Sequence, residues 1–201
     1  MYEFLAKKLL ISLGGQNFLS QSEFEIAQYN LTIILVNIGK LSLVYSVAWW
    51  ADTFLYTLLT NLSFVVLRKF SGGWHALNSI MCTLSSLIIF VGLPKILLKT
   101  HWEIKPTTFY IWWLLLSILV LRYAPADTEA NPLVNRSLRR TMKKKAIIIM
   151  ALVTTLPVFT SCTNQLFCLL GLTIEVITIH PLYYFLLKRS YNNFEKYQTN
   201  D

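Results

Sequence analysis

The chain has 201 residues, of which 55% are apolar and only 14% are charged. Soluble domains usually carry about 25% charged residues, so this composition argues against an ordinary soluble protein and favours an all-α integral membrane protein. The net charge of +8 does not indicate a nucleic-acid partner, because membrane proteins gather basic residues on one side of the bilayer. Three cysteines are too few for a disulfide framework.

The first twenty residues predict an amphipathic helix that lies at the membrane interface. The segment has no long apolar stretch followed by a small-residue cleavage site, so we do not interpret it as a signal peptide. Apolar residues recur at helical spacing and two lysines fall on another face: Tyr2, Leu5, Leu9 and Leu13, with Lys7 and Lys8. After it, the sequence SEFE (residues 22–25) has capping-box spacing, which predicts that the next helix begins near Glu23.

Six apolar stretches are candidates for crossing the bilayer, which needs about 20 residues of helix. We expect one membrane domain over residues 1–201, with spans at 31–50, 51–67, 76–98, 107–124, 146–161 and 166–187. With both termini in the cytoplasm, these spans place fourteen of the eighteen lysines and arginines on the cytoplasmic side. The positive-inside rule therefore supports this orientation in a cell membrane.

The loop between the second and third spans reads RKFSGGWHALNSIMC, from Arg68 to Cys82. A lone cysteine in a span is most often a packing residue. A nucleophilic thiol needs a nearby base, and His75 lies at the same interface. On one continuous helix these two side chains would be about 10.5 Å apart along the axis, so a catalytic pair requires the loop to fold back. Gly72 and Gly73 permit such a fold.

Three further residues have alternative interpretations. Asn78 either orients His75 or packs as a span amide, and Arg68 is a candidate oxyanion donor beside the backbone N–H groups near Cys82. His180 is a rival base, but a polar group that satisfies backbone carbonyls freed by Pro181 is the simpler interpretation.

Lys40 and Glu175 both fall near the membrane midplane, where unpaired charges are unfavourable. We expect them to form a structural pair, and the alternative is a proton or ion path. The few His, Cys and acidic residues are scattered over both faces and different depths, so we expect no metal site and no cofactor.

The segment 122–145 is predicted to be a basic cytoplasmic loop, broken by Pro125 and Pro132. Attraction to anionic membrane lipids would explain its charge, and docking of an acidic peptide is a further possibility. The six basic residues of its second half are Arg136, Arg139, Arg140, Lys143, Lys144 and Lys145.

Four motifs together resemble the accessory gene regulator B family, the membrane cysteine endopeptidases of bacterial peptide quorum sensing. The motifs are NIGKL (residues 37–41), TLLTNLSF (57–64), the GGWHA loop that leads to Cys82, and YAPADT (123–128). The resemblance implies that His75 and Cys82 are the catalytic pair. It also implies a substrate with an amphipathic leader, a signal core and an acidic tail, and a homodimeric enzyme.

By this resemblance, Cys82 cleaves the precursor after its core and holds the core as a thioester, which an internal Cys or Ser attacks to close a thiolactone or lactone ring. Two other classes are open. A small transporter would use Lys40, Glu175 and His180, and an adaptor would tolerate loss of both His75 and Cys82. The sequence does not give the precursor, the cleavage position or whether His75 acts within one chain or across a dimer.

Overall fold

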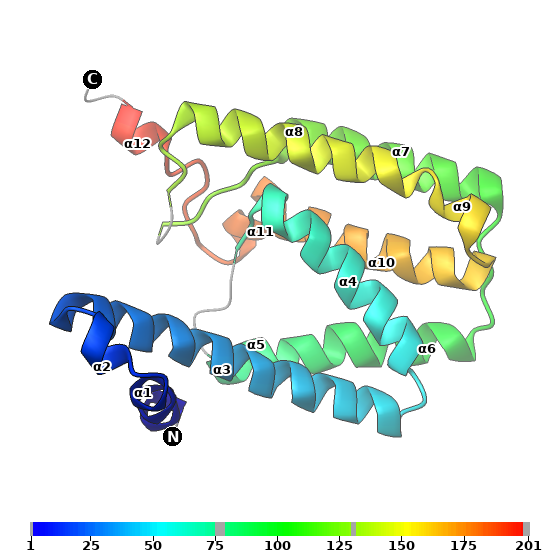
Figure 1. The fold of residues 1–201 in the computed structure, drawn as a ribbon. Coiled ribbons are helices and arrows are strands. Elements are labelled where there is room, and N and C mark those ends of the chain that lie inside the picture. The colour runs from blue at the N-terminus through cyan, green and yellow to red at the C-terminus, as the bar shows by residue number, and fades with distance from the viewer. Residues whose placement is uncertain (1, 75–78, 130–131, 199–201) are drawn as a thin grey trace.

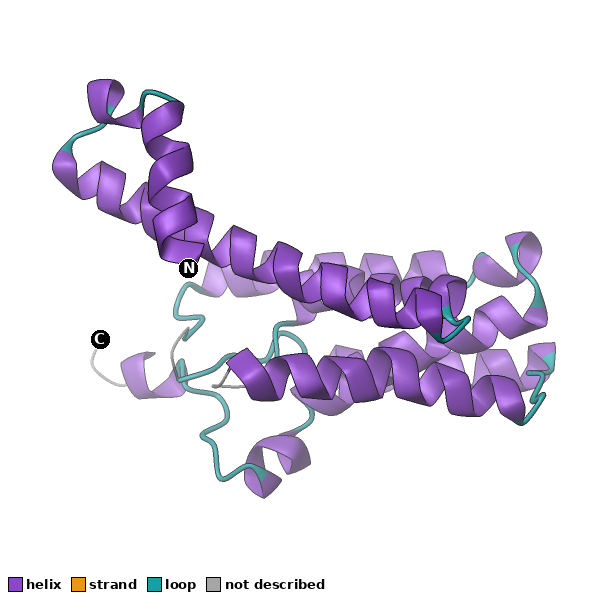
Figure 2. Cartoon of the chain, turned by 90° about the horizontal axis from the view of Figure 1, so that it is seen from below, coloured by secondary structure: helices purple, strands orange, loops and turns teal. Residues whose placement is uncertain are grey.

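The computed structural model describes residues 2–74, 79–129 and 132–198. In these ranges the regular structure is helical, with one isolated bridge between Gly72 and Ala126 in place of a sheet (Figures 1 and 2). The elements are α1 (Tyr2–Ser12), α2 (Gly15–Phe18), α3 (Gln21–Trp50), α4 (Phe54–Ser71), α5 (Ser79–Leu87), the π-helical turn η1 (Ile88–Gly92), α6 (Leu93–Lys99), α7 (Pro106–Tyr123), α8 (Arg136–Val153), α9 (Leu156–Phe159), α10 (Cys162–Ile179), α11 (Pro181–Leu186) and α12 (Glu195–Gln198).

The N-terminal residues form helices, and α1 packs along the first part of α3. The capping box of α3 involves Ser20 and Glu23, not the predicted residues 22–25: the Ser20 hydroxyl accepts from the Glu23 N–H, and the Glu23 carboxylate accepts from the Ser20 N–H. These contacts satisfy two amides that the helix leaves unpaired, so α3 begins at Gln21, two residues before the predicted start.

Among the residues that the structure describes, two apolar clusters hold the bundle together. The larger one joins α4, α7, α8 and α10 and includes Leu67, Phe109, Met150 and Leu172. The smaller one joins α3 to η1 through Val44, Ala48, Phe90 and Val91. Figure 1 shows the same division, with α3, α5 and α6 in a lower layer and α7 and α8 at the top.

Helices α4 and α10 cross at close range. A Cβ added at Gly171 would collide with the Thr60 carbonyl oxygen and with the Ser63 hydroxyl. Small residues at such a crossing let two backbones come together, which is how helices pack where apolar burial gives little driving force. This crossing brings the last turn of α4 beside the last turn of α10.

The third predicted span, 76–98, is described from Ser79 to Lys99 as α5, η1 and α6, so it is not one regular helix. The irregular turn precedes Pro94, which has no N–H to donate and whose ring would clash with the carbonyl of residue 90 in a regular helix. The wider π turn accommodates this residue.

Four helical segments are long and apolar enough to cross a membrane in the described part of the chain: Gln21–Trp50, Ser79–Lys99, Pro106–Tyr123 and Cys162–Ile179. They correspond to the predicted spans at 31–50, 76–98, 107–124 and 166–187. The predicted spans at 51–67 and 146–161 correspond to α4 and to α8 with α9, which are not among the four. Both α4 and α8 contain basic residues, and α8 carries six of them.

The start of α8 and the end of α10 differ most from the sequence prediction. Helix α8 begins at Arg136, where the Asn135 side chain accepts from the N–H groups of Ser137 and Leu138. Residues 136–145 are therefore helical and not part of a loop. Helix α10 ends at Ile179, because Pro181 cannot continue it, and residues 181–186 form the separate helix α11.

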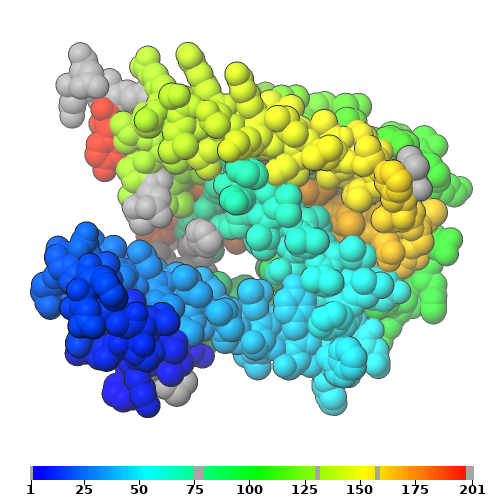
Figure 3. All heavy atoms as spheres, in the orientation of Figure 1, coloured from blue at the N-terminus to red at the C-terminus, as the bar shows by residue number. Residues whose placement is uncertain are grey.

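The segments that follow α4 and α7 lie at one end of the bundle, together with both termini and the C-terminal segment, residues 187–198 (Figures 1 and 2). The space-filling view shows a hollow between α3, in blue, and the teal end of α4, near the middle of the view (Figure 3). The candidate site is built from the segments that meet at that end of the bundle.

Candidate functional site

Helix α4 stops at Ser71 because the next two residues leave helical geometry. Gly72 has φ 72° and Gly73 has φ 108°, values that favour glycine because side chains with a Cβ rarely adopt them. A continuous helix from Gly73 to Cys82 is therefore not formed. His75 and Asn78 lie outside the described residues, so the structure gives no distance between His75 and Cys82.

The YAPADT segment (residues 123–128) clasps the glycine pair, in the sense that Ala126 forms backbone hydrogen bonds on both sides of Gly72. The Gly73 N–H donates to the Ala126 carbonyl at 3.1 Å, and the Ala126 N–H donates to the Ser71 carbonyl at 2.8 Å. A Cβ at Gly72 would collide with the Ala126 carbonyl oxygen. The sequence analysis noted the YAPADT motif but assigned it no structural role. In the structure, its Ala126 holds the start of the loop through these hydrogen bonds.

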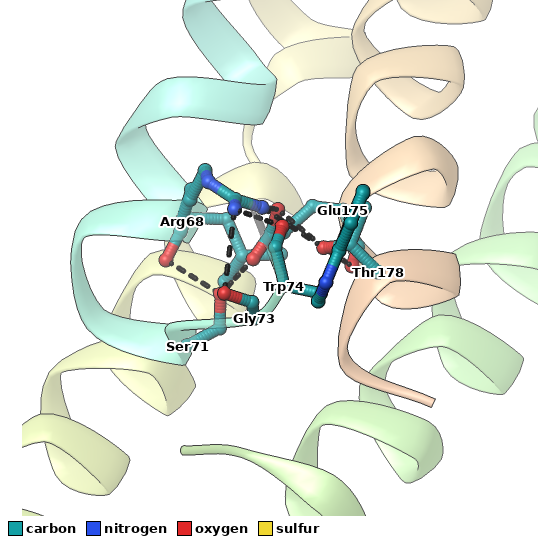
Figure 4. A network of polar contacts seen from close by, with 7 residues as sticks. Arg68, Ser71, Gly73, Trp74, Glu175 and Thr178 are labelled. Carbon is teal, nitrogen blue, oxygen red and sulfur yellow. Dashed lines mark hydrogen bonds and ion pairs between the residues drawn. The ribbon is translucent and has the colours of Figure 1, made fainter. Parts of the chain in front are cut away.

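A buried polar network joins the loop to the bundle (Figure 4). The Arg68 Nη1 group donates to the Glu175 carboxylate and to the Thr178 hydroxyl, each at 3.0 Å. The Arg68 Nη2 group donates to the carbonyl oxygens of Gly73 and Trp74, at 3.4 and 2.5 Å. One guanidinium thus connects the end of α4, the side chains of α10 and the backbone of the loop.

This network changes the expected roles of two residues. Arginine has five N–H donors, and four of those on Arg68 are already engaged, so the side chain is poorly suited to receive an oxyanion. Glu175 forms its ion pair with Arg68 and not with Lys40. Lys40 is half-buried on α3 and belongs to neither of the two ion pairs found among the described residues.

Cys82 lies on α5 and is a free, partly exposed thiol. Cys162 is also free and partly exposed, but it is the first residue of α10, at the opposite end of that helix from Glu175. Cys168 is buried in the middle of α10. Of the three thiols, Cys82 is the one whose helix follows the loop.

His180 has a structural task at the break between α10 and α11. Its Nδ1 accepts from the Leu182 N–H at 3.2 Å, and its ring packs edge-on against Tyr123 with centroids 4.7 Å apart. It thus pairs a backbone N–H at the helix start, whereas we expected it to satisfy freed carbonyls. A ring nitrogen engaged in this way is not available as a base.

The basic residues of α8 separate into two groups. Arg136, Arg139, Arg140 and Lys143 recur at helical spacing and line a cavity of about 610 Å³. Lys144 and Lys145 do not line it, and Lys145 lies over the Phe70 ring at 5.4 Å.

Sequence reasoning missed the other residues of this cavity. Arg122, Tyr123 and Pro125 come from the end of α7 and the segment after it, and Tyr191 and Asn192 come from the C-terminal segment. Burial, followed by the nearby Tyr123, raises the pKa of Tyr191 to about 12, so this phenol is neutral at physiological pH. The cavity is therefore strongly cationic, because its lining in the described part of the chain contains five basic side chains and no acidic one.

Asp127 is a second residue that sequence reasoning missed. Its buried carboxylate accepts from three backbone N–H groups, those of Leu133, Asn193 and Phe194, at 2.8 to 3.3 Å. Its carbonyl accepts from the Tyr184 hydroxyl at 2.9 Å. It ties the C-terminal segment to the segment that clasps the glycines. The aspartate of YAPADT was a visible signal, but its partners in the C-terminal segment are more than sixty residues away.

The helices and the loop define a helical protein whose apolar segments are compatible with a membrane and whose site lies in a glycine-rich loop before a cysteine-bearing helix. The sequence matches the family model described as accessory gene regulator B over residues 2–179. An AgrB-like protein of Listeria monocytogenes is 37% identical over 175 residues, covering 85% of this chain and 83% of the relative.

The accessory gene regulator protein B of Staphylococcus aureus strain MRSA252 is 33% identical over 172 residues, covering 86% of this chain and 90% of the relative. The chain belongs to the accessory gene regulator B family. No solved structure matches it.

Proposed function

We propose that this protein is a membrane-embedded cysteine endopeptidase that removes the C-terminal tail of a quorum-sensing pro-peptide and closes the remaining core into a ring. The observation that carries the proposal is membership of the accessory gene regulator B family over a range that includes both His75 and Cys82. The free thiol of Cys82, on the helix that follows a glycine-shaped loop, supports it.

In the proposed reaction, His75 accepts the Cys82 proton and the thiolate attacks the carbonyl carbon after the signal core. The C–N bond breaks, His75 returns the proton to the leaving amine, and the tail departs. The core is then bound to Cys82 as a thioester. A Cys or Ser side chain within the core attacks that thioester, loses its proton to His75, and releases the ring and the Cys82 thiolate.

A site below the membrane surface suits this chemistry. Converting an amide into a thioester is uphill, and water would hydrolyse the acyl-enzyme before the ring closed. A site with little water that holds the internal nucleophile close favours cyclisation. The position of Cys82 on an apolar segment that meets the requirements for a membrane span supports this arrangement.

The cationic cavity beside α8 is our proposed dock for the acidic tail of the precursor. Arg122, Arg139 and Arg140 line it, and the YAPADT segment that clasps Gly72 and Gly73 contributes Pro125 to its wall. A tail held there would leave the residues before it within reach of the loop. Opposite charges across such a contact mainly set the specificity and the rate of association.

The proposed activity is tested with purified protein in lipid vesicles and a synthetic precursor with an amphipathic leader, a core that contains a cysteine, and an acidic tail. Chromatography measures release of the tail. We expect Cys82→Ala to abolish release and Cys162→Ala, which removes another partly exposed thiol, to leave it unchanged. Tail release by Cys82→Ala at the rate of the unmodified protein would refute the proposal.

The dock is tested by two charge-matched double variants. Arg139→Gln with Arg140→Gln removes two charges from the cavity, whereas Lys144→Gln with Lys145→Gln removes two charges outside it. We expect the first pair to raise the half-saturating precursor concentration about tenfold, an effect that added salt reduces, and the second to change it less than about twofold. Equal effects of the two pairs would show that the cavity is not the dock.

A further inference from the structure

Glu175 is a charged residue in the apolar core that the proposed chemistry does not use. Its side chain is fully buried on α10, one turn before that helix ends. One carboxylate oxygen accepts from the Ser71 hydroxyl, and the other accepts from Arg68 and Thr178. A buried carboxylate is tolerated only when paired and hydrogen-bonded as completely as this one.

The pairing orients the Arg68 guanidinium. Because the group is planar, fixing Nη1 on Glu175 and Thr178 also fixes the direction of Nη2. Nη2 then points at the carbonyl oxygens of Gly73 and Trp74, as Figure 4 shows. A lysine would supply a single ammonium, which cannot reproduce this fork.

The loop is restrained here from other sides as well. The Trp74 N–H donates to the Thr178 carbonyl at 3.4 Å, and the Trp74 ring packs edge-on against Tyr183 with centroids 6.0 Å apart. A Cβ at Gly73 would lie 2.8 Å from the Thr178 hydroxyl oxygen, so the chain passes against α10 without room for a side chain. Trp74 is the last described residue before His75.

We infer that Glu175 is a positioning residue for His75: through Arg68 it holds the carbonyl groups of Gly73 and Trp74, which sets the direction in which the chain enters the residue that follows. A peptide unit is planar, so a restrained Trp74 carbonyl also restrains the peptide bond that leads into His75. The inference rests on the proposed catalytic pair, and Glu175 itself touches no reacting atom.

The test measures how fast iodoacetamide alkylates Cys82 as a function of pH, in protein whose Cys162 and Cys168 are replaced by serine. Intact-mass spectrometry follows the single remaining thiol. An imidazolium close to a thiolate stabilises it, so alkylation begins at lower pH than for an isolated thiol. We expect His75→Ala to move the half-maximal pH upward by about one unit, and Glu175→Gln to move it in the same direction.

The double variant His75→Ala with Glu175→Gln is expected to behave like His75→Ala alone, because both changes act on the same proposed contact between the His75 imidazole and the Cys82 thiolate. Glu129→Gln is the matched control, since it neutralises the acid of the exposed ion pair with Arg189, and we expect it to leave the profile unchanged. A role of Glu175 in stability alone would lower the melting temperature without moving the profile.

The outcomes separate the inference from the proposed function. An unchanged profile in His75→Ala would refute the catalytic pair itself. A shift in His75→Ala with none in folded Glu175→Gln would refute only the positioning role. If Glu175→Gln does not fold, Arg68→Lys decides the question: it keeps the buried charge but loses the fork, so the same upward shift is expected, and an unchanged profile overturns the inference.

Discussion

At the scale of single residues, Gly73 is one of two adjacent positions, with Gly72, where the loop allows no side chain. Its φ of 108° and the 2.8 Å between an added Cβ and the Thr178 hydroxyl oxygen oppose substitution independently of each other. We expect Gly73→Ala to destabilise the protein by about 1–3 kcal/mol and to lower its melting temperature by several degrees. The control is Gly92→Ala, where a Cβ has ordinary space and the backbone is helical, so no comparable loss is expected.

Thermal unfolding in detergent checks this prediction, and equal melting temperatures for Gly73→Ala and the unmodified protein would contradict it.

The sequence indicated that the two glycines shape the loop, because few other residues permit such a turn. The sequence did not indicate which atoms a side chain at these two glycines would collide with. The Ala126 carbonyl and the Thr178 hydroxyl approach from segments about 50 and 100 residues away, and composition and periodicity carry no information about such distances.

The partner of Glu175 shows the same limit. The sequence predicted Lys40 and Glu175 at the same depth in the membrane, but a shared depth does not identify which helices are neighbours. Helix α10 packs most extensively against α4, and the long Arg68 side chain reaches back from the last turn of α4 to Glu175. Charge pairing in a bundle therefore depends on helix order, which a single sequence does not reveal.

At the scale of elements, hydropathy located α7 within one residue of its observed bounds, because that helix is apolar along its length. It located α3 at its C-terminal end alone, because the first ten residues of α3 are mostly polar. It failed for the start of α8, whose first ten residues are mostly basic or polar yet helical. Arginine, lysine and methionine are good helix formers, and Asn135 caps the segment, so helix propensity in place of apolarity would have found this start.

The C-terminal segment is held by Asp127, and its release is testable. We expect Asp127→Asn to weaken the contacts to the backbone N–H groups of Asn193 and Phe194, because a neutral amide oxygen accepts less strongly and the NH₂ group that replaces the other oxygen cannot accept. Trypsin should then cleave after Lys188, Arg189 or Lys196 about tenfold faster, since local opening controls proteolysis.

Mass spectrometry of timed digests measures this effect. Asp52→Asn is the control, because Asp52 is exposed and its φ of 57° suits asparagine equally well, so digestion should be unchanged. Digestion of Asp127→Asn at the same rate as the control would show that the carboxylate does not hold the segment.

At the scale of the whole molecule, the start of the site loop, the segments that line the cationic cavity and both termini lie at one end, whereas residues 101–105 lie at the other end (Figure 1). The excess of basic residues at the first end predicts that it faces the cytoplasm. Cysteines introduced singly at Glu129 and Glu103, both exposed, report on the two ends in protein without its native thiols.

A membrane-impermeant maleimide added to intact cells should label Glu103→Cys and should label Glu129→Cys only after the membrane is opened. Labelling of Glu129→Cys in intact cells would contradict the orientation, and with it a cytoplasmic site. The sequence predicted this arrangement from charge alone, and the bundle adds that the connections and both termini assemble at one end.

The most direct test of the peptidase account is intact-mass spectrometry of the protein mixed with the synthetic precursor. We predict a hydroxylamine-labile adduct with the mass of the precursor minus its acidic tail, present on the unmodified protein and on Cys162→Ala and absent from Cys82→Ala. An unmodified Cys82, while the same sample releases the tail and forms the ring, would contradict the thioester mechanism at its centre.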